Sequence, residues 1–263
     1  MAAGGSFSTR DLQPGSKLAN LDGDPELLAK GAFREALLHE EQNVDGIYYA
    51  HAGKLPLAGR ISVFARDRMY EHFIAVMGPD RESTILDFGV SEDITGESNA
   101  LERRYPFPHQ ITCAGLGDGG LLKAAFPTVH HVVLQKNTLL PFDDKQFTIA
   151  YSNALFEHLG SDANRHAAAI ELLRVAHGVY LTVPNRWFPI EHHTGIPLLH
   201  FHIGLFRTAL RQTGLNYWAN PQNLDFISKR RVARFIPVGV PFQTAYCGLR
   251  LGPFSSNLAI WFD

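Results

Sequence analysis

Three polar side chains follow two short apolar runs at a spacing that suits proton transfer. His158 comes just after the run at residues 147–152, while Glu191 and His193 follow the run at residues 179–183. Histidine changes charge near neutral pH, and a neighbouring carboxylate can orient its ring and stabilise the charged form. We therefore predict His193 as a general base supported by Glu191, with His158 at the same edge of the fold. The alternative is that all three are hydrogen-bonded structural residues.

The stretch around these side chains also raises a metal site as an alternative, because imidazole and carboxylate groups are good zinc ligands. The residue types concerned are those of Glu191, His192, His193, His200 and His202. Their order, EHH followed by six residues and HxH, matches no common zinc signature such as HExxH. We therefore predict no metal ligand among them.

Short apolar runs alternate with helical segments through the middle of the chain. The runs are rich in valine and isoleucine and regularly interrupted, as buried parallel strands are. They lie at residues 85–89, 111–116, 131–134, 147–152 and 179–183. Connecting helices are predicted at residues 98–105, 120–126 and 162–176. Residues 246–262 add two β-like runs around a Gly-Pro break, which predicts a closing antiparallel hairpin at one sheet edge.

This alternation predicts an α/β fold, a doubly wound and mostly parallel seven-stranded sheet with helices on both faces. Residues 1–58 are expected to form a loose arm and an amphipathic helix at 25–41. Residues 59–263 are expected to form the main domain, with a helix at 62–77 and an insertion around 186–240.

Composition and charge favour a globular protein whose substrate is a small molecule. Of 263 residues, 45% are hydrophobic and 19% are charged, which suits one large core. The net charge is -2 with both signs interspersed, so we expect neither a nucleic-acid nor a membrane partner. The first residues lack a basic region followed by an apolar one, so we expect a cytoplasmic protein. The N-terminal helix offers a surface for a protein partner or a second copy of the chain.

Several motifs in series resemble the class I S-adenosylmethionine-dependent methyltransferases, above all the subgroup described as type 11. The resemblance covers roughly residues 60–263. The motifs are LDFG at residues 86–89, Asp118, LPFDD at 140–144 and EHL at 157–159. The stretch PNRWFPIE at 184–191 with His193, and ESN at 97–99, resemble a little-characterised bacterial branch of these enzymes. The resemblance implies a Rossmann-like methyltransferase fold and S-adenosyl-L-methionine as the cofactor.

The resemblance also implies a set of cofactor-binding residues. Gly89 would let the backbone turn tightly beneath the cofactor. Asp118 would accept hydrogen bonds from the ribose hydroxyls, or alternatively cap a helix or turn. Asn137 would accept a hydrogen bond from the adenine amino group, and Leu140 would wall the ring unless it is a plain core residue. The predicted set is Asp87, Gly89, Ser91, Asp118, Asn137, Leu140 and Ser152.

Methyl transfer from a sulfonium needs a general base when the acceptor is a hydroxyl. With His193 as that base, we predict a methyltransferase that acts on a small-molecule acceptor at oxygen. Aromatic residues at 187–218 would wall the acceptor or form a small hydrophobic cluster. Residues 90–96 lack the glycines of the usual GxGxG loop, so the alternative is a catalytically silent methyltransferase-like binding or assembly protein. A nicotinamide dehydrogenase is disfavoured because no GxGxxG opens the first crossover.

Overall fold

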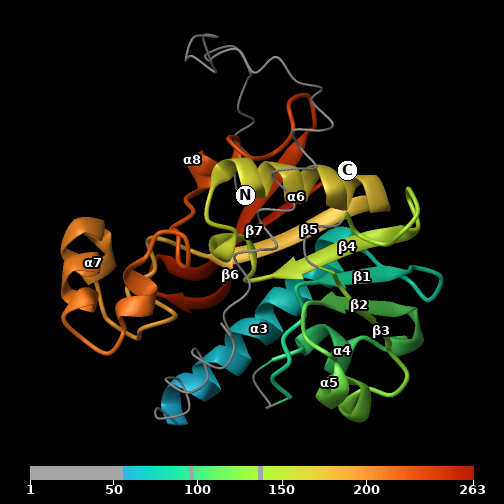
Figure 1. The fold of residues 1–263 in the computed structure, drawn as a ribbon, viewed down its shortest axis with the longest axis horizontal. Helices are drawn as coiled ribbons and strands as arrows, with labels where there is room; N and C mark the ends of the chain where they lie inside the picture. The colour runs from blue at the N-terminus through green and yellow to red at the C-terminus, as the bar shows by residue number, and fades with distance from the viewer. Residues whose placement is uncertain (1–55, 95–97, 136–138) are drawn as a thin grey trace.

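A computed structural model describes residues 56–94, 98–135 and 139–263, and places a seven-stranded sheet at the centre of the molecule (Figure 1). The strand order is β3-β2-β1-β4-β5-β7-β6. The strands are β1 (Ile85–Phe88), β2 (Ile111–Gly115), β3 (His130–Val133), β4 (Phe147–Asn153), β5 (Ala176–Pro184), β6 (Phe242–Leu251) and β7 (Phe254–Phe262).

The first five strands pair in parallel, and β7 then pairs antiparallel with both β5 and β6. The chain builds outward from β1 to β3, then returns to the other side of β1 to add β4 and β5. In such sheets ligands lie outside the carboxyl ends of the strands, near the point where the strand order reverses. That point here is the junction of β1 and β4.

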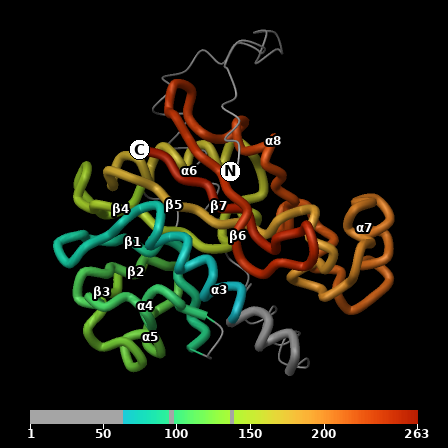
Figure 2. The backbone as a smooth tube through the Cα atoms, turned by 180° about the vertical axis from the view of Figure 1, so that it is seen from behind, coloured from blue at the N-terminus to red at the C-terminus, as the bar shows by residue number. Residues whose placement is uncertain are grey.

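Helices cover both faces of the sheet (Figures 1 and 2). On one face, α6 (Asp162–Val175) and α8 (Lys229–Val232) contribute to the larger hydrophobic cluster. On the other, α3 (Pro56–Met77) and α4 (Ala100–Arg104) pack on a second cluster, and α5 (Gly120–Ala125) connects β2 to β3. The inner strands β1, β4 and β5 are buried on both sides, which explains why they are largely continuous apolar runs.

Residues 185–241 separate β5 from β6 and build a small lobe of their own. Its elements are η5 (Leu199–Phe201), α7 (Ile203–Arg211) and η6 (Asn216–Ala219), whereas α8 follows the lobe and packs on the sheet. Phe206, Leu210 and Trp218 are fully buried in a third hydrophobic cluster within this lobe. Figures 1 and 2 both show α7 at the opposite end of the molecule from β3.

The predicted fold class is confirmed, since the sheet is seven-stranded, mostly parallel and covered on both faces. All five predicted parallel strands and the closing hairpin are present, and their bounds shift by three residues or fewer at the inner strands. The predicted helix at 25–41 and the arm before it lie outside the described residues. The helix predicted at 62–77 starts earlier, at Pro56, where a proline suits the first turn. Among the described residues, no helix is long and apolar enough to cross a membrane.

Candidate functional site

Glu157 and His158 lie on a single 3-10 turn, η4 (Phe156–His158), just beyond the carboxyl end of β4. Arg165, on α6, is bonded to this turn, because its Nε donates a hydrogen bond to the carbonyl oxygen of Phe156 at 2.7 Å. The guanidinium is fully buried and also pairs with Asp162 and Asp225, at 2.8 and 2.9 Å. The backbone amide of Asp225 in turn donates to the carbonyl of Glu157 at 3.0 Å. A buried ion-pair network therefore fixes the position of η4.

Glu191 organises the segment that follows β5. Its carboxylate accepts hydrogen bonds from the backbone amides of His193 and Thr194, at 3.1 and 2.8 Å, and from the Thr194 hydroxyl at 2.7 Å. It also pairs with Nδ1 of His193 at 2.9 Å. Burial by itself would raise the pKa of Glu191, but the charge of His193 and these hydrogen bonds lower the pKa to about 2. Glu191 is therefore a buried carboxylate that folds its own loop and orients one imidazole, as the sequence predicted for His193.

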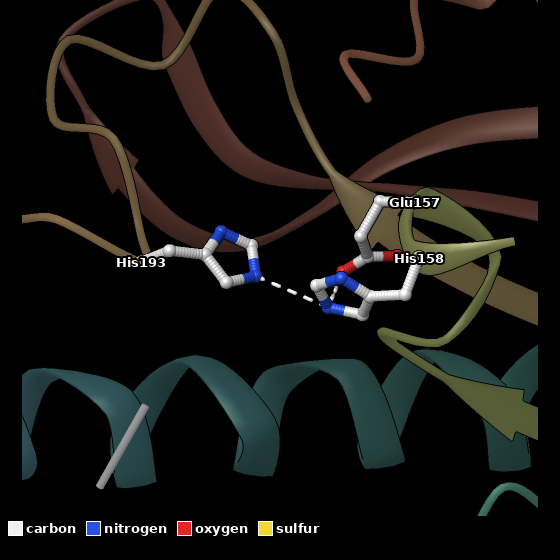
Figure 3. A group of neighbouring side chains, drawn as sticks. All are labelled: Glu157, His158 and His193. Atoms are coloured by element: carbon white, nitrogen blue, oxygen red, sulfur yellow. Dashed lines mark hydrogen bonds and ion pairs between the residues drawn. The ribbon is translucent and has the colours of Figure 1, made fainter. Parts of the chain in front are cut away.

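The two histidines meet across the sheet edge. Figure 3 shows that each ring points one nitrogen toward the other ring: His193 Nε2 and His158 Nε2 are 3.3 Å apart, and the ring planes are perpendicular, at 89°. His158 Nδ1 lies 2.7 Å from the carbonyl oxygen of Asn223, which can only accept, so Nδ1 carries the proton and Nε2 carries the lone pair. His193 must then donate from Nε2 to His158 and from Nδ1 to Glu191. The geometry thus requires a proton in this contact.

Burial and mutual charge set the proton affinities of the site. Burial, followed by the charge of His193, lowers the pKa of His158 to about 3. Burial opposes the charged form of His193 too, but the Glu191 carboxylate outweighs it and raises the pKa of His193 above its ordinary value. Burial raises the pKa of Glu157 to about 7 although His193 and Arg165 act against it. The site therefore favours the charged form of the His193 ring and the neutral form of the His158 ring, and it opposes ionisation of Glu157.

Glu157 is the member of this site that the sequence analysis did not single out. Its side chain is 1% exposed, and neither carboxylate oxygen receives a hydrogen bond from another residue that the structure describes. Its Oε1 lies 3.9 Å from His158 Nε2 (Figure 3). The signal that could have found it is its place beside His158 in the EHL motif.

The small lobe packs against the two histidines of the site. The Trp218 ring lies 4.7 Å from the His193 ring and 6.0 Å from the His158 ring, measured between centroids. Trp218 belongs to the third hydrophobic cluster, and Asn223 on the same lobe supplies the carbonyl that orients His158. Much of the aromatic set predicted at 187–218 therefore forms a small hydrophobic cluster, with Trp218 as the ring that also walls the histidines.

Asp87 lies on β1 and is buried against α4 and β2. Glu102 of α4 hydrogen-bonds to it, and Cys113 Sγ donates to Glu102 Oε1 at 3.2 Å. Burial, with the nearby Glu102 charge, raises the pKa of Asp87 well above its ordinary value. Two carboxyl groups in contact hold a proton between them because both cannot ionise at once. Asp87 thus links β1 to α4 through its hydrogen bond with Glu102.

Gly89 and Ser91 shape the loop after β1. Gly89 has φ +83°, and a Cβ atom there would lie 2.5 Å from Leu155 Cδ2, two residues before Glu157. Ser91 Oγ accepts the backbone amide of Asp93 at 3.1 Å, and its carbonyl accepts Asn99 Nδ2 at the same distance. The loop after β1 and the turn after β4 therefore pack directly on each other at the switch point.

Glu92 reaches from that loop to the carboxyl end of β2. Its Oε1 accepts the backbone amide of Gly119 at 3.0 Å, and a Cβ atom built on Gly117 would collide with the same oxygen. A small pocket here is lined by Glu92, Gly117, Gly119 and His131. Asp118 is exposed and accepts the backbone amide of Gly120 at 2.8 Å, which is the turn-forming alternative. The carboxylate that lines this pocket is consequently Glu92, which the sequence analysis did not single out.

The remaining predicted cofactor residues lie elsewhere on the sheet. Leu140 is 3% exposed in the larger hydrophobic cluster, and its backbone amide donates to Glu171 at 2.9 Å. Ser152 is buried on β4, and its Oγ has no hydrogen-bond partner among the described residues. Asn137 lies outside the residues that the structure describes. The structure brings His158, Glu191 and His193 together, whereas Asp87 and Leu140 face opposite sides of the sheet.

Comparison with known proteins agrees with this architecture. No family model matches the sequence, and no curated protein matches it. Among solved structures, the plantazolicin methyltransferase BamL, in complex with a triazolic desmethylPZN analog and SAH, has a TM-score of 0.53 over 91% of this chain and 98% of its own, at 8% identity. The chain has the class I methyltransferase fold. A putative zinc-dependent alcohol dehydrogenase from Rhodobacter sphaeroides gives a TM-score of 0.52 at 12% identity, over 84% of this chain and 98% of its own. Identities this low show the fold alone.

Proposed function

We propose that the chain is an S-adenosylmethionine-dependent methyltransferase that methylates a small molecule at oxygen. The observation that carries the proposal is the pair of contacts from Glu191 to His193 and from His193 to His158. These side chains lie at the carboxyl edge of the sheet in a class I methyltransferase fold, next to the turn that packs on Gly89. BamL, which shares the fold, is a methyltransferase in complex with SAH and a triazolic desmethylPZN analog. The shared fold supports the motif resemblance.

The residues around the loop after β1 fit an S-adenosylmethionine nucleoside in chemical type. Glu92 offers a carboxylate to ribose hydroxyls at the pocket by Gly117, where the absence of a Cβ leaves room for it. His131 lines the same pocket and has a buried Nε2 with no hydrogen-bond partner among the described residues. We assign ribose binding to Glu92 with Asp118 beside it. Ser91 and Gly89 position the loop, Asp87 braces it, and Asn137, Leu140 and Ser152 remain proposed contacts to the rest of the cofactor.

The cofactor supplies the methyl group on a sulfonium, and the protein must remove the hydroxyl proton of the acceptor. His193 in its neutral form is the proposed base, and Glu191 is its positioning partner. The neutral ring keeps the proton that Nδ1 donates to Glu191 and accepts the hydroxyl proton at Nε2, and the carboxylate stabilises the imidazolium that forms. A hydroxyl that takes the place of the His158 ring in the 3.3 Å contact would deliver its proton to Nε2 of neutral His193. Trp218 excludes water from this contact.

Calorimetric titration of S-adenosylhomocysteine into the full chain tests the proposal, with Glu92→Gln and Asp118→Ala as a matched pair. We expect micromolar binding, a loss of about tenfold or more in Glu92→Gln because a charged hydrogen bond is lost, and a smaller loss in Asp118→Ala. Absence of binding by the unaltered chain at millimolar ligand would overturn the proposal. Equal losses in the two variants would overturn the assignment of Glu92.

A second candidate function is a methyltransferase-like binding or assembly protein without catalysis. Two observations favour it: side chains instead of glycines follow Gly89, and the small lobe leaves Trp187, Leu198 and Leu205 exposed at 44%, 56% and 63%. Exposed apolar groups of this size favour contact with another protein. Turnover of a methyl acceptor by the purified chain alone would rule this candidate out.

A further inference from the structure

We infer that Glu157, His158 and His193 together form a binding site for a divalent metal ion of the zinc class. The inference concerns a ligand that the sequence pattern did not predict. It does not depend on cofactor binding, although it places the metal beside the proposed acceptor site.

The donor atoms of the three side chains converge. One ligand atom from each residue lies within 4.8 Å of those of the other two, and all three residues are buried. The two imidazole Nε2 atoms are 3.3 Å apart. Two nitrogens at about 2.0–2.1 Å from one tetrahedral ion are also about 3.3 Å apart. The carboxylate oxygen, 3.9 Å from His158 Nε2, needs only a small side-chain movement to complete the set.

Both histidines are already oriented as metal ligands. His158 presents Nε2 because its Nδ1 donates to the Asn223 carbonyl at 2.7 Å, and His193 presents Nε2 because its Nδ1 pairs with Glu191 at 2.9 Å. Metal-bound histidines almost always donate their other ring nitrogen to a carbonyl or a carboxylate. The structure supplies one of each. Both rings therefore direct the same nitrogen to the same point (Figure 3).

Glu157 gives an independent reason for a cation at that point. Its side chain is 1% exposed, and neither oxygen receives a hydrogen bond from another described residue. A buried carboxylate without a partner is costly unless it is protonated or coordinates a metal. A cation that displaces the proton between the two rings binds this carboxylate and the lone pairs of both Nε2 atoms at once.

The donor set selects the kind of metal. Two imidazoles and one carboxylate favour zinc and related transition ions, whereas magnesium and calcium prefer oxygen ligands alone. Three protein ligands with a position left over are typical of zinc ions that bind a water or a substrate oxygen. With the metal bound, His193 is a ligand, and the metal's charge would lower the pKa of an acceptor hydroxyl bound at the remaining position. The metal site thus rests on the donor geometry, and this last consequence rests on the proposed function.

Zinc titration of the chelator-treated full chain by calorimetry tests the inference, with cobalt absorption as a second reading of tetrahedral nitrogen ligation. We expect one ion per chain, and an affinity at least about 100-fold weaker in His158→Gln and His193→Gln. His192→Gln is the matched control, because it removes the neighbouring imidazole and leaves the donor set intact. We expect its affinity to stay within about threefold of the unaltered chain.

Thermal unfolding of the same proteins separates a lost ligand from a lost fold. Zinc should raise the Tm of the unaltered chain and of His192→Gln, and leave the Tm of a cooperatively unfolding His193→Gln unchanged. The inference is overturned if the chain binds no stoichiometric zinc, if His193→Gln binds it as tightly, or if His192→Gln loses it equally. A chain that binds zinc but no S-adenosylhomocysteine would keep the metal site and remove the methyltransferase proposal.

Discussion

Two buried groups of ligand-type side chains lie in this protein, and they differ in what surrounds them. We call Glu157, His158 and His193 the histidine cluster, and Asp87, Glu102 and Cys113 the carboxyl cluster. The donor atoms of each lie within 4.8 Å of one another. In the carboxyl cluster, Asp87 and Glu102 are hydrogen-bonded to each other and the Cys113 thiol donates to Glu102 Oε1, although Glu102 Oε2 has no partner among the described residues. In the histidine cluster the second nitrogen of each ring is held by an outside group, and the inner nitrogens face each other.

The difference shows that proximity alone does not make a metal site. Burial raises the pKa of Cys113, and the nearby Glu102 and Asp87 charges raise it further, so the thiol stays protonated and is a poor ligand. The histidine cluster instead has two ring nitrogens directed at one point, which can both bind a cation once the proton between them is lost, and one carboxylate whose two oxygens both lack a donor among the described residues. Its loops are also held by ion pairs, whereas the carboxyl cluster stands on β1, α4 and β2.

Removal of the guanidinium beneath η4 should have the largest effect. In Arg165→Met, the bonds to the Phe156 carbonyl and to Asp162 and Asp225 are lost, and breaking such a buried pair costs about 3–5 kcal/mol. Urea unfolding measures the change. Arg68→Ala is the control, because its ion pair with Glu71 is half exposed and should contribute less than about 1 kcal/mol. Similar losses in both variants would mean that the network does not support the histidine cluster.

Exchange of one carboxylate in each region should separate the two clusters next. Glu191→Gln weakens the hold on His193 Nδ1, and outer partners of this kind contribute about 10–100-fold to metal affinity. Glu102→Gln alters the carboxyl cluster only, so zinc affinity should not change. Calorimetry with zinc reads both variants. A loss of zinc affinity in Glu102→Gln would show that the clusters are coupled or that the ion binds at the wrong one.

Gly89 links the two regions, since it follows Asp87 by two residues and contacts Leu155 before η4. An alanine there must adopt a positive φ, at a cost of about 1–2 kcal/mol, and also displace Leu155. Gly78→Ala is the matched control, because its φ is +57° and nothing lies within 4 Å of an added Cβ. We expect Gly89→Ala to be the less stable by about 1 kcal/mol and to bind S-adenosylhomocysteine more weakly. Equal unfolding free energies of the two variants would mean that the Leu155 side chain moves aside without an energetic cost.

The sequence was enough to predict the sheet but not the partners within the site. Period and turn residues located β1, β2, β4 and the closing hairpin because each buried strand is an uninterrupted apolar run. The prediction that His193, Glu191 and His158 share one edge needed only the rule that parallel strands end together. It stopped short of Glu157, whose importance depends on which side chains surround it in the folded state.

The sequence also carried no signal for the contacts that long side chains make between loops. Glu92 lies beside Gly117 because one loop crosses another, and no spacing in the sequence encodes that approach. Glu102 meets Asp87 because α4 packs on β1, so an aspartate predicted to serve a ligand instead has a carboxyl neighbour. The fold class follows from local pattern, whereas these pairs follow from packing that only the assembled fold defines.

The smallest expected effect is on the carboxyl cluster and depends on pH. Burial and Glu102 raise the pKa of Asp87 in the folded state, so the folded chain holds a proton that the unfolded chain releases above its ordinary pKa near 4. The stability contributed by this proton is complete below that value and is lost as pH rises toward the folded-state pKa, by up to about 1.4 kcal/mol per pH unit. Asp87→Asn keeps a neutral donor to Glu102 and cannot ionise, so its unfolding free energy should fall less between about pH 5 and 8. Urea unfolding across that pH range tests this expectation. Parallel curves of unfolding free energy for the two proteins would mean that Asp87 is ionised in the folded state. The contrast between the carboxyl cluster, whose carboxyl groups bond to each other, and the histidine cluster would then be wrong.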